Sequence, residues 1–569
     1  MERGVAHRRP GLREPAHAQS AALAPPNPGD GTRGAGNSGT PPKGSAVGGT
    51  LYGPVGSQVG LQVNAGDDLV VTVPPFGAGT DPYNFIDFAF ATPLLDGAAY
   101  QVTLKTTPVG QTCSVFQGAS GTMPVAVGAL HVGCEITDDL LTRNSNSAAS
   151  PVTGTFFESS AAVIGGANVP IGSGTQAYGE GRFVAFVSSA VGLATGATAA
   201  HRQIYWRDRF TGVTLLVSAD ASGAQGNGDS FAPAISADGL TVAFESAASN
   251  LVAGDTNAVS DVFVWTALTQ GTAPGVTRVS VGLAGVQANA SSVEPSLSGD
   301  GNLVAFSTFA SNLTAGVGDT LSANVVLRDI VAGTNTLVSA DGGGVARGGS
   351  KPMLSESGTR LAFYSFSSQL VAGDTNSLWD IFVFDSGTGT NTRVSLTSAG
   401  GERDQGTESA SRVVAAALSG NGQFVAYATT ATNVVAADTN GLQDIFVVNL
   451  STGGVARASL AAAGTQGNGD SPVGQGERPS LSFDGTWLAF SSKASNLGAA
   501  ADNVLLHNNL TGETRVISTQ STGTLNPPVI SRDGGYVVFG AAAPLDSRFA
   551  SSGLFAHFTQ LAPSFWWLP

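Results

Sequence analysis

Three loops of the sequence share one polar pattern that could bind a metal ion. Each reads Asp-Thr-Asn and, after three further residues, a second Asp, which places two carboxylates and one amide oxygen within seven residues. Ca²⁺ takes roughly six to eight hard oxygen ligands, so backbone carbonyls and water would have to complete each weak site. The alternative is an Asx turn between two strands, which we rank ahead of metal binding. The candidate ligands are Asp255, Asn257, Asp261, Asp374, Asn376, Asp380, Asp438, Asn440 and Asp444.

No arrangement of side chains typical of catalysis is visible in the sequence. The 6 histidines are scattered without an H-x-x-x-H pair, and no G-x-S-x-G nucleophile motif occurs. Such patterns are what a nucleophile, a general base or a zinc site needs at short spacing. The sequence therefore predicts no catalytic residues and no enzyme, with calcium as the one candidate ion.

The composition narrows the class of partner. The chain has 569 residues with 26 Lys and Arg against 41 Asp and Glu, a net charge of −15. An acidic surface repels phosphate backbones, which argues against nucleic acid as a partner. No apolar run approaches the roughly 18 residues of a membrane helix, so no membrane-spanning segment is predicted. The first residues also lack the apolar core of a signal peptide.

One unit recurs seven times after about residue 150. Its clearest part is a turn, often Asp-Gly or Asn-Gly, followed by a strand that is apolar at consecutive positions and ends on an aromatic residue. Repeats of this size, roughly 60 residues, are typical of a propeller or a solenoid. A strand that is apolar on both faces is covered on both faces, as in the middle of a propeller blade. The aromatic residues are Phe186, Phe244, Phe306, Phe363, Tyr427, Phe490 and Phe539.

Two more strands follow in each unit, which gives four strands with the one before the turn. The predicted fold class is all-β: a seven-bladed β-propeller of four-stranded blades preceded by a small β-sandwich domain, with an open β-solenoid as the alternative. The last repeat has only three strands of its own, and we expect Gly154–Ile164 to supply its outer strand. The predicted boundaries are a disordered leader over 1–48, the sandwich over 49–136, a linker over 137–152 and the propeller over 153–569.

Four motifs recur together in the repeats: S-x-D-G-x-x-x-A-F, S-N-L-V-A-G-D-T-N, D-I-F-V and T-R-V-S. Over roughly residues 178–560 this combination resembles the TolB-type, WD-repeat-like propeller repeats common in exported bacterial proteins, although the first repeat lacks the D-T-N element. Residues 60–136, with NAGDDLVVTV and GQTCSV, resemble a small β domain found beside such repeats. Both resemblances imply an exported protein, in the periplasm, on the outer surface or secreted. No signal peptide is visible in this chain.

The exported location bears on the only two cysteines, Cys113 and Cys134, which are 134 − 113 = 21 residues apart. In an exported domain such a pair predicts a disulfide, which would contribute ~3 kcal/mol in the chain-entropy model. Two buried thiols in a cytosolic protein are the alternative.

Two connections between repeats are nearly identical and read Gln-Gly-Asn-Gly-Asp-Ser. In a propeller they would share a face with the D-T-N loops, nearer the central channel, so we take this face as the candidate binding face, with flexible solvated loops as the alternative. The candidate residues are Gln225, Asn227, Asp229, Gln466, Asn468 and Asp470.

The predicted function is a non-enzymatic binding or scaffold protein of the bacterial envelope or exterior, with a protein or glycan ligand. Fold alone does not decide this, because propellers host many functions. One alternative is a propeller enzyme that acts on polysaccharide as a lyase or a glycosidase. The other is a structural surface protein stiffened by calcium.

Overall fold

The computed structural model describes residues 44–559 except 55, 75–82, 125–129, 142–161, 166–168, 172–173, 177–180, 199, 210–211, 268–274, 316–321, 405–415, 462–463, 473–477, 499–502, 519–526 and 542–552. The predicted leader over 1–48 lies almost wholly outside the described residues. The described part is nearly all β, which confirms the predicted fold class. It contains no helix whose length and hydropathy would let it cross a membrane.

Two four-stranded sheets near the N-terminus share one apolar core. Leu51, Leu61 and Val132 are among its fully buried members. One sheet has the order β5 (Tyr83–Ala89), β2 (Gly48–Pro54), β10 (Leu130–Ile136), β8 (Gln111–Gln117), and the other β4 (Asp67–Thr72), β3 (Gln58–Val63), β7 (Ala99–Thr106), β9 (Ser120–Thr122). Short β1 (Gly44–Ser45) pairs with β6 (Leu94–Leu95).

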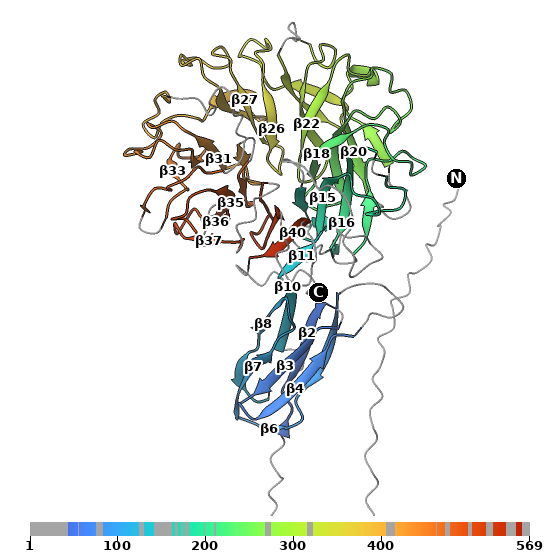
Figure 1. Cartoon of the computed structure of the whole chain (residues 1–569), viewed down its shortest axis with the longest axis vertical. Coiled ribbons are helices and arrows are strands. Elements are labelled where there is room, and N and C mark those ends of the chain that lie inside the picture. The colour runs from blue at the N-terminus through green and yellow to red at the C-terminus, as the bar shows by residue number, and fades with distance from the viewer. Residues whose placement is uncertain are drawn as a thin grey trace, which may run out of the picture. The chain divides into compact units, whose positions relative to one another are not determined.

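The described residues from 138 onward form seven further four-stranded sheets, which surround a common axis (Figure 1). We number these sheets as blades 1 to 7 and give their strands from the axis outward. They are blade 1, β12 (Ala162–Gly165), β15 (Phe183–Ser188), β16 (Gln203–Asp208), β17 (Thr214–Leu216); blade 2, β18 (Ser230–Ile235), β19 (Thr241–Ser246), β20 (Asp261–Thr266), β21 (Gly275–Arg278); blade 3, β22 (Ser292–Leu297), β23 (Leu303–Thr308), β24 (Asn324–Asp329), β25 (Thr334–Leu337); blade 4, β26 (Ser350–Leu354), β27 (Arg360–Ser365), β28 (Asp380–Asp385), β29 (Thr390–Arg393); blade 5, β30 (Ala417–Leu418), β31 (Phe424–Thr429), β32 (Asp444–Asn449), β33 (Val455–Arg457); blade 6, β34 (Ser480–Leu481), β35 (Trp487–Ser492), β36 (Asn503–Asn508), β37 (Thr514–Val516); and blade 7, β38 (Val529–Ile530), β39 (Tyr536–Ala541), β40 (Gly553–Phe558), β11 (Asp138–Leu140). A hairpin of β13 (Val169–Ile171) and β14 (Gly174–Gln176) and the short 3-10 helix η1 (Leu283–Gly285) complete the described elements.

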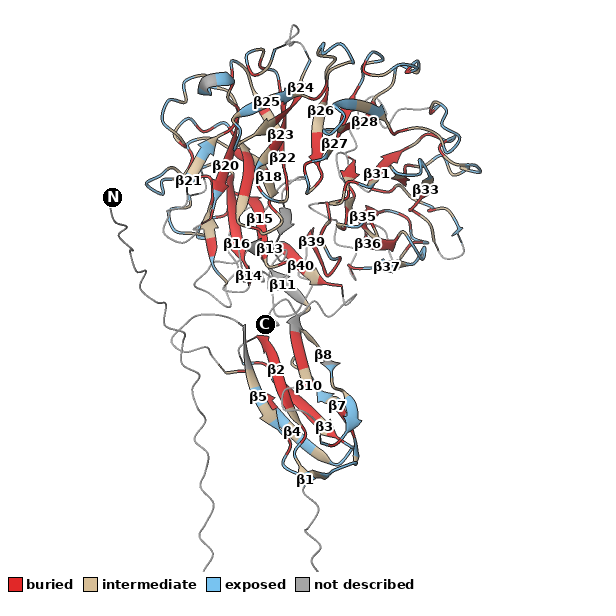
Figure 2. Ribbon diagram, turned by 180° about the vertical axis from the view of Figure 1, so that it is seen from behind, coloured by how far each residue is buried: buried red, intermediate tan, exposed pale blue. Residues whose placement is uncertain are grey.

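The second strand of each blade is buried on both faces, as its sequence predicts. In β19, Val242, Ala243 and Phe244 have no exposed surface, although their side chains alternate between the two faces of the sheet. Phe244 packs in the cluster shared with blade 1, whereas Ala243 packs in the cluster shared with blade 3. Figure 2 shows the same burial along the middle strands of the other blades. Each blade is therefore stable only between two neighbours.

The Asp-Gly turns join neighbouring blades through their backbones. In blade 2, Asp238 Oδ1 accepts hydrogen bonds from Ser236 Oγ at 2.5 Å and from the Leu240 N–H at 3.0 Å, and Gly239 has a φ of +75°, which an L side chain rarely adopts. In blades 2 to 6 the residue one or two positions after the turn serine donates a backbone hydrogen bond to the next blade. These backbone bonds run from Ala237 N to Gly299 O (2.9 Å), Gly299 N to Glu356 O (2.7 Å), Glu356 N to Gly420 O (2.9 Å), Asn421 N to Phe483 O (2.8 Å) and Phe483 N to Arg532 O (2.8 Å).

A strand from before the repeats closes the last blade, but it is not the predicted one. Residues 138–140, which the sequence analysis assigned to a linker, form β11 and pair antiparallel with β40. The described end of the predicted segment 154–164 instead belongs to β12, the inner strand of blade 1. The prediction was wrong because β11 is only three residues long and shows no apolar alternation. Leu141, directly after it, is fully buried in the cluster shared by blades 7 and 1.

We expect Leu141→Ala to destabilise the propeller by about 2–5 kcal/mol, the usual cost of a large-to-small change in a core. All 6 tryptophans follow residue 200, so tryptophan fluorescence during urea denaturation reports on the propeller and not on the N-terminal sheets. Leu510→Ala, at a residue that is 78% exposed, is the matched control and should change stability by less than ~0.5 kcal/mol. Equal effects of the two changes would show that this segment does not close the ring.

Candidate functional site in the central channel

Each D-T-N loop holds two carboxylates around an arginine from the outer strand of the same blade, and in blade 4 a second arginine, Arg403, also pairs with Asp380 at 2.6 Å. In blade 4, Arg393 Nη1 lies 2.8 Å from Asp374 Oδ1 and 3.5 Å from Asp380 Oδ2, and all three side chains are buried. Blades 2 and 5 repeat the arrangement, so the positive charge among these carboxylates comes from the protein itself. The ion pairs join Arg278 to Asp255 (3.5 Å) and Asp261 (3.6 Å), and Arg457 to Asp438 (3.2 Å) and Asp444 (3.4 Å).

The asparagine of each loop forms an Asx turn. Asn257 Oδ1 accepts the Val259 N–H at 3.2 Å, and Asn376 and Asn440 each accept from the residue two positions on at 3.0 Å. Within the part of the chain that the structure describes, no three His, Cys, Asp or Glu side chains are grouped closely enough to hold a metal ion. Calcium binding by these loops stays a prediction, and it requires the ion to displace the guanidinium.

Burial shifts the pKa of aspartate carboxyls in these loops. Burial raises the pKa of Asp374, Asp438 and Asp444 above the ordinary value of 3.8, while the paired arginine opposes the shift. The folded protein therefore binds a proton at these carboxyls more tightly than the unfolded chain does. The resulting stabilisation is complete below the ordinary pKa and is lost as the pH rises through the folded pKa.

The Gln-Gly-Asn-Gly-Asp connections fasten neighbouring blades to each other. Gln466 Oε1 accepts the Asn440 N–H at 3.1 Å, in the D-T-N loop of blade 5, and Asn468 Nδ2 donates to Ser495 Oγ of blade 6 at 2.9 Å. The structure thus brings the predicted binding-face residues into hydrogen bonds with neighbouring loops, and ligand binding by them stays a prediction. The remaining contacts are Gln225 Oε1 with Thr198 N–H (2.6 Å), Asn227 Nδ2 with Ser249 Oγ (3.1 Å), Asp229 Oδ1 with Arg202 N–H (3.0 Å) and Asp470 Oδ1 with Gln443 N–H (3.1 Å).

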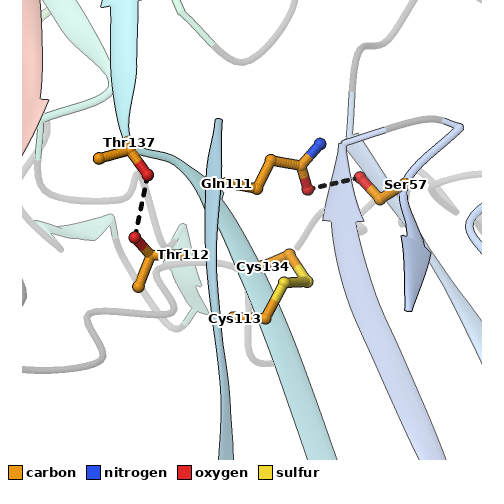
Figure 3. The surroundings of a disulfide bond; sticks show 6 residues. All are labelled: Ser57, Gln111, Thr112, Cys113, Cys134 and Thr137. Atoms are coloured by element: carbon orange, nitrogen blue, oxygen red, sulfur yellow. Dashed lines mark hydrogen bonds between the residues drawn. A yellow bond between two sulfur atoms is a disulfide. The ribbon is translucent and has the colours of Figure 1, made fainter. Parts of the chain in front are cut away.

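The predicted disulfide is present in the N-terminal sheets. Cys113 on β8 and Cys134 on β10 face each other across antiparallel strands and are bonded (Figure 3). Beside the bond, Gln111 Oε1 accepts the Ser57 hydroxyl at 2.8 Å, which ties β8 to the segment before β3. This confirms the pairing expected from the sequence.

The inner strands of blades 2, 3 and 4 share a bulge that the sequence analysis did not identify. In each strand the register shifts across two unpaired residues, of which the second is a proline. Proline has no N–H to leave unsatisfied, so it suits an unpaired position. The residue before it has a φ of +48° at Ala232, +57° at Glu294 and +54° at Lys351, a costly conformation without glycine. All three line a cavity on the axis of the ring.

This cavity has a volume of about 220 Å³ and is the central channel of the propeller. Inner-strand residues of blades 2 to 7 line it. Five of these strands carry proline at the same offset before the turn serine. The prolines are Pro233, Pro295, Pro352, Pro479 and Pro528.

Hydrogen bonds fix one carboxylate oxygen of Glu294, whereas the other has no hydrogen-bond partner among the described residues. Its Oε2 accepts the Ser307 hydroxyl at 2.8 Å and the Lys351 N–H at 3.0 Å. Among the described residues its Oε1 has no hydrogen-bond partner. The Glu294 N–H donates to Glu245 Oε2 at 2.6 Å, and burial raises the pKa of Glu245, with the charge of Glu294 adding to the shift. An oriented carboxylate of this kind can act as a general base or acid.

Arg478, from blade 6, is one of two basic residues that line the channel, the other being Lys351. Its side chain is open to the cavity but lies deep within the ring, and this burial lowers the pKa of the guanidinium while the charge of Glu294 opposes the shift. It forms no hydrogen bond or ion pair with any residue of the described ranges. Its five N–H donors in a planar fork therefore remain available for an anion in the channel.

The opposite end of the channel, at the Asp-Gly turns, is crossed by an ion pair. Arg532 Nε of blade 7 lies 2.9 Å from Glu356 Oε2 of blade 4, and the guanidinium stacks on the Phe483 ring at 3.9 Å from its centre. Gly299 and Gly420 complete the wall around this pair. The Arg532–Glu356 ion pair therefore lies across the end of the channel behind a ligand bound by Arg478.

A signal for these channel residues is present in the sequence. The residue before the recurrent proline varies from blade to blade, whereas the turn that follows is almost constant. These residues are Ala232, Glu294, Lys351, Arg478 and Pro527. Where the rest of a repeat is regular, a position that varies indicates a residue that the fold does not require and that can take part in a binding site. The sequence analysis missed it because each blade contributes a single residue, with no local spacing to recognise.

Comparisons with known proteins agree with the fold. Neither a protein-family model nor a curated protein matches the sequence. Similar solved structures include a TolB protein from Agrobacterium tumefaciens (17% identity, 61% of this chain and 93% of that chain, TM-score 0.32). They also include the β-propeller domain of the Trilobed protease from Pyrococcus furiosus (11%, 66% and 92%, TM-score 0.41) and oligogalacturonate lyase from Vibrio parahaemolyticus (10%, 81% and 98%, TM-score 0.41).

The TolB structures share the β-propeller fold that the sequence resemblance implied. The expectation of a non-enzymatic binding or scaffold protein is contradicted, because the similar structures also include enzymes, namely oligogalacturonate lyases and prolyl endopeptidases. The sequence reasoning considered only catalytic residues that lie close together in the chain, whereas a propeller can also bring together side chains from separate blades.

We expect Arg457→Met to lower the free energy of unfolding by about 3–5 kcal/mol, because it leaves two buried carboxylates without a counter-charge. Arg515→Met is the matched control, since Arg515 lies on the outer strand of the next blade and its pair with Glu513 is exposed. The control should cost less than ~1 kcal/mol. Urea denaturation followed by circular dichroism measures both, and similar losses would mean that the buried pair does not stabilise the ring.

The shifted carboxyls also predict a pH dependence. Relative to Asp438→Asn, the wild-type protein should lose stability as the pH rises from 3.8 through the raised pKa of Asp438. Asp220 has a lowered pKa, because it accepts hydrogen bonds from Ser222 and the backbone, so relative to Asp220→Asn the wild type should gain stability as the pH rises. Melting temperatures between pH 3 and pH 7 test this pair of opposite slopes, and slopes of the same sign would refute it.

Proposed function

We propose that the central channel is the active site of an enzyme that acts on an acidic saccharide. One observation carries the proposal: Arg478 lines the channel with no partner among the described residues, and the oriented carboxylate of Glu294 lines the same channel. An arginine fork recognises a carboxylate by two parallel hydrogen bonds. We base the proposal on these residues, because the likeness to the oligogalacturonate lyases is one of fold alone.

The channel residues divide the chemistry between them. Arg478 would bind the sugar carboxylate and withdraw charge from it, which acidifies the neighbouring C–H. Glu294 would take that proton through the open Oε1, while Ser307 and the Lys351 N–H keep the other oxygen fixed. The electron pair of the C–H bond would form a double bond, and the glycosidic oxygen on the next carbon would leave with a proton from solvent.

The disulfide and the TolB-type resemblance support an exported location for this activity. Structural disulfides persist in oxidising compartments and are rare in the cytosol. Polymers of acidic sugars are also met outside the cytoplasm. We therefore propose that the protein acts in the periplasm or outside the cell.

The proposal predicts that the full chain binds an oligogalacturonate and not a neutral galacto-oligosaccharide, as measured by calorimetry. Arg478→Met should weaken the binding at least tenfold, because a charge-assisted hydrogen bond contributes roughly 1.5–3 kcal/mol. Arg515→Met, which removes an exposed arginine far from the channel, should leave the affinity unchanged. Equal binding of the neutral saccharide, or unaltered binding by Arg478→Met, would overturn the proposed site.

Glu294→Gln separates chemistry from binding. The amide keeps the size of the side chain but cannot take a proton, so this variant should bind the oligogalacturonate and fail to convert it. Ultraviolet absorbance of the conjugated double bond measures elimination, and new reducing ends without absorbance would indicate hydrolysis. Full turnover by Glu294→Gln would exclude Glu294 as the base.

A further inference from the structure

A second cavity lies between blades 5 and 6, outside the central channel. Its volume is about 620 Å³, and most of its wall is apolar. The charged side chain in the wall, Arg457, is already held between Asp438 and Asp444. The apolar part of the wall is formed mainly by Phe424, Val447, Val455, Ala458 and Leu460.

His507 gives this cavity one directed polar group. The Thr514 hydroxyl donates its proton to the Leu460 carbonyl at 3.2 Å, and His507 Nδ1 lies 2.9 Å from the same hydroxyl oxygen. We assign the proton of that hydroxyl to the Leu460 carbonyl, and with this assignment Nδ1 carries the hydrogen and donates it to Thr514 Oγ. Nε2 then carries the lone pair and is an acceptor.

The acceptor stays uncharged and accessible. His507 is 5% exposed, and burial lowers its pKa to about 4, so the imidazole is neutral at neutral pH. No described residue donates a hydrogen bond to Nε2, and this nitrogen is not fully enclosed by the protein. His507 lines the cavity, so a ligand in the cavity can reach the lone pair.

The equivalent positions of other blades explain why the cavity forms here. Blade 2 carries Trp265 and blade 4 carries Phe384 at the strand position of His507, and both rings are buried. Opposite this position, Asn391 of blade 4 donates to two carbonyl oxygens that follow the outer strand of blade 3. Asn335 of blade 3 donates to the Val281 carbonyl, which follows the outer strand of blade 2, and to the Leu313 carbonyl of its own blade. In blade 6 the shorter Thr514 reaches only one carbonyl, which leaves the crevice unfilled.

We propose that the cavity between blades 5 and 6 binds a small uncharged molecule, largely apolar and with one hydrogen-bond donor directed at His507 Nε2. The apolar wall favours the body of the ligand by burial. The neutral acceptor at His507 Nε2 selects for an N–H or O–H group, and no unpaired charge in the described wall would attract an ion. This site is independent of the anion site at Arg478.

Indole and indene test the proposal on the full chain, because they share size and shape but only indole has an N–H donor. Ligand-observed NMR titration should show indole binding about five- to tenfold more tightly than indene, the effect of one neutral hydrogen bond. His507→Phe, which copies the residue of blade 4, should remove this preference. His557→Phe, at the same strand position of blade 7, is the control and should retain it.

Each outcome decides the proposal. Equal affinity of the two compounds for the wild-type protein, or no binding of either at millimolar concentration, overturns it without any variant. A preference for indole that survives in His507→Phe places the donor contact elsewhere and also overturns it. Circular dichroism on both variants establishes that they are folded.

Discussion

The constraint on which the propeller depends is that the second strand of every blade is apolar on both faces. Val242, Ala243 and Phe244 cannot be covered by one partner sheet, so blade 2 must lie between blades 1 and 3, and the same holds around the ring. A row of such sheets has two uncovered ends, and only closure removes them. Closure is achieved by β11 and Leu141, which complete blade 7 and pack against blade 1.

The polar residues of the repeats divide into two sets with different roles. The regular set fastens the blades: an arginine between two aspartates, an Asx turn and a glutamine or asparagine that reaches the neighbouring loop. The irregular set stands before the recurrent proline of the inner strands and lines the channel, and in blades 2, 3 and 4 this position is part of a bulge. A position that varies from blade to blade can become asymmetric, so Glu294 and Arg478 can line the same channel within a ring of similar sheets.

The sequence was sufficient for features that repeat or that depend on residue type. The all-β class followed from consecutive apolar positions and Asp-Gly turns, and the Cys113–Cys134 bond followed from the pair and the resemblance to exported proteins. The strand β11 was missed because three residues, Asp-Asp-Leu, carry no periodicity. The channel site was missed because Glu245, Glu294 and Arg478 come from three blades, and only the closed ring brings them together. The D-T-N aspartates were recognised as a cluster, but their arginine lies on another strand and could not be paired with them from spacing.

The central claim is that Arg478, which has no partner among the described residues, binds an anion in the channel. A crystal structure of the full chain soaked in bromide tests it most directly, because bromide is located by its own anomalous signal. We predict a bromide peak within hydrogen-bond distance of the Arg478 guanidinium inside the channel, and its loss in Arg478→Met crystals. A guanidinium paired with a carboxylate of the protein, with no bromide in the channel, would contradict the account.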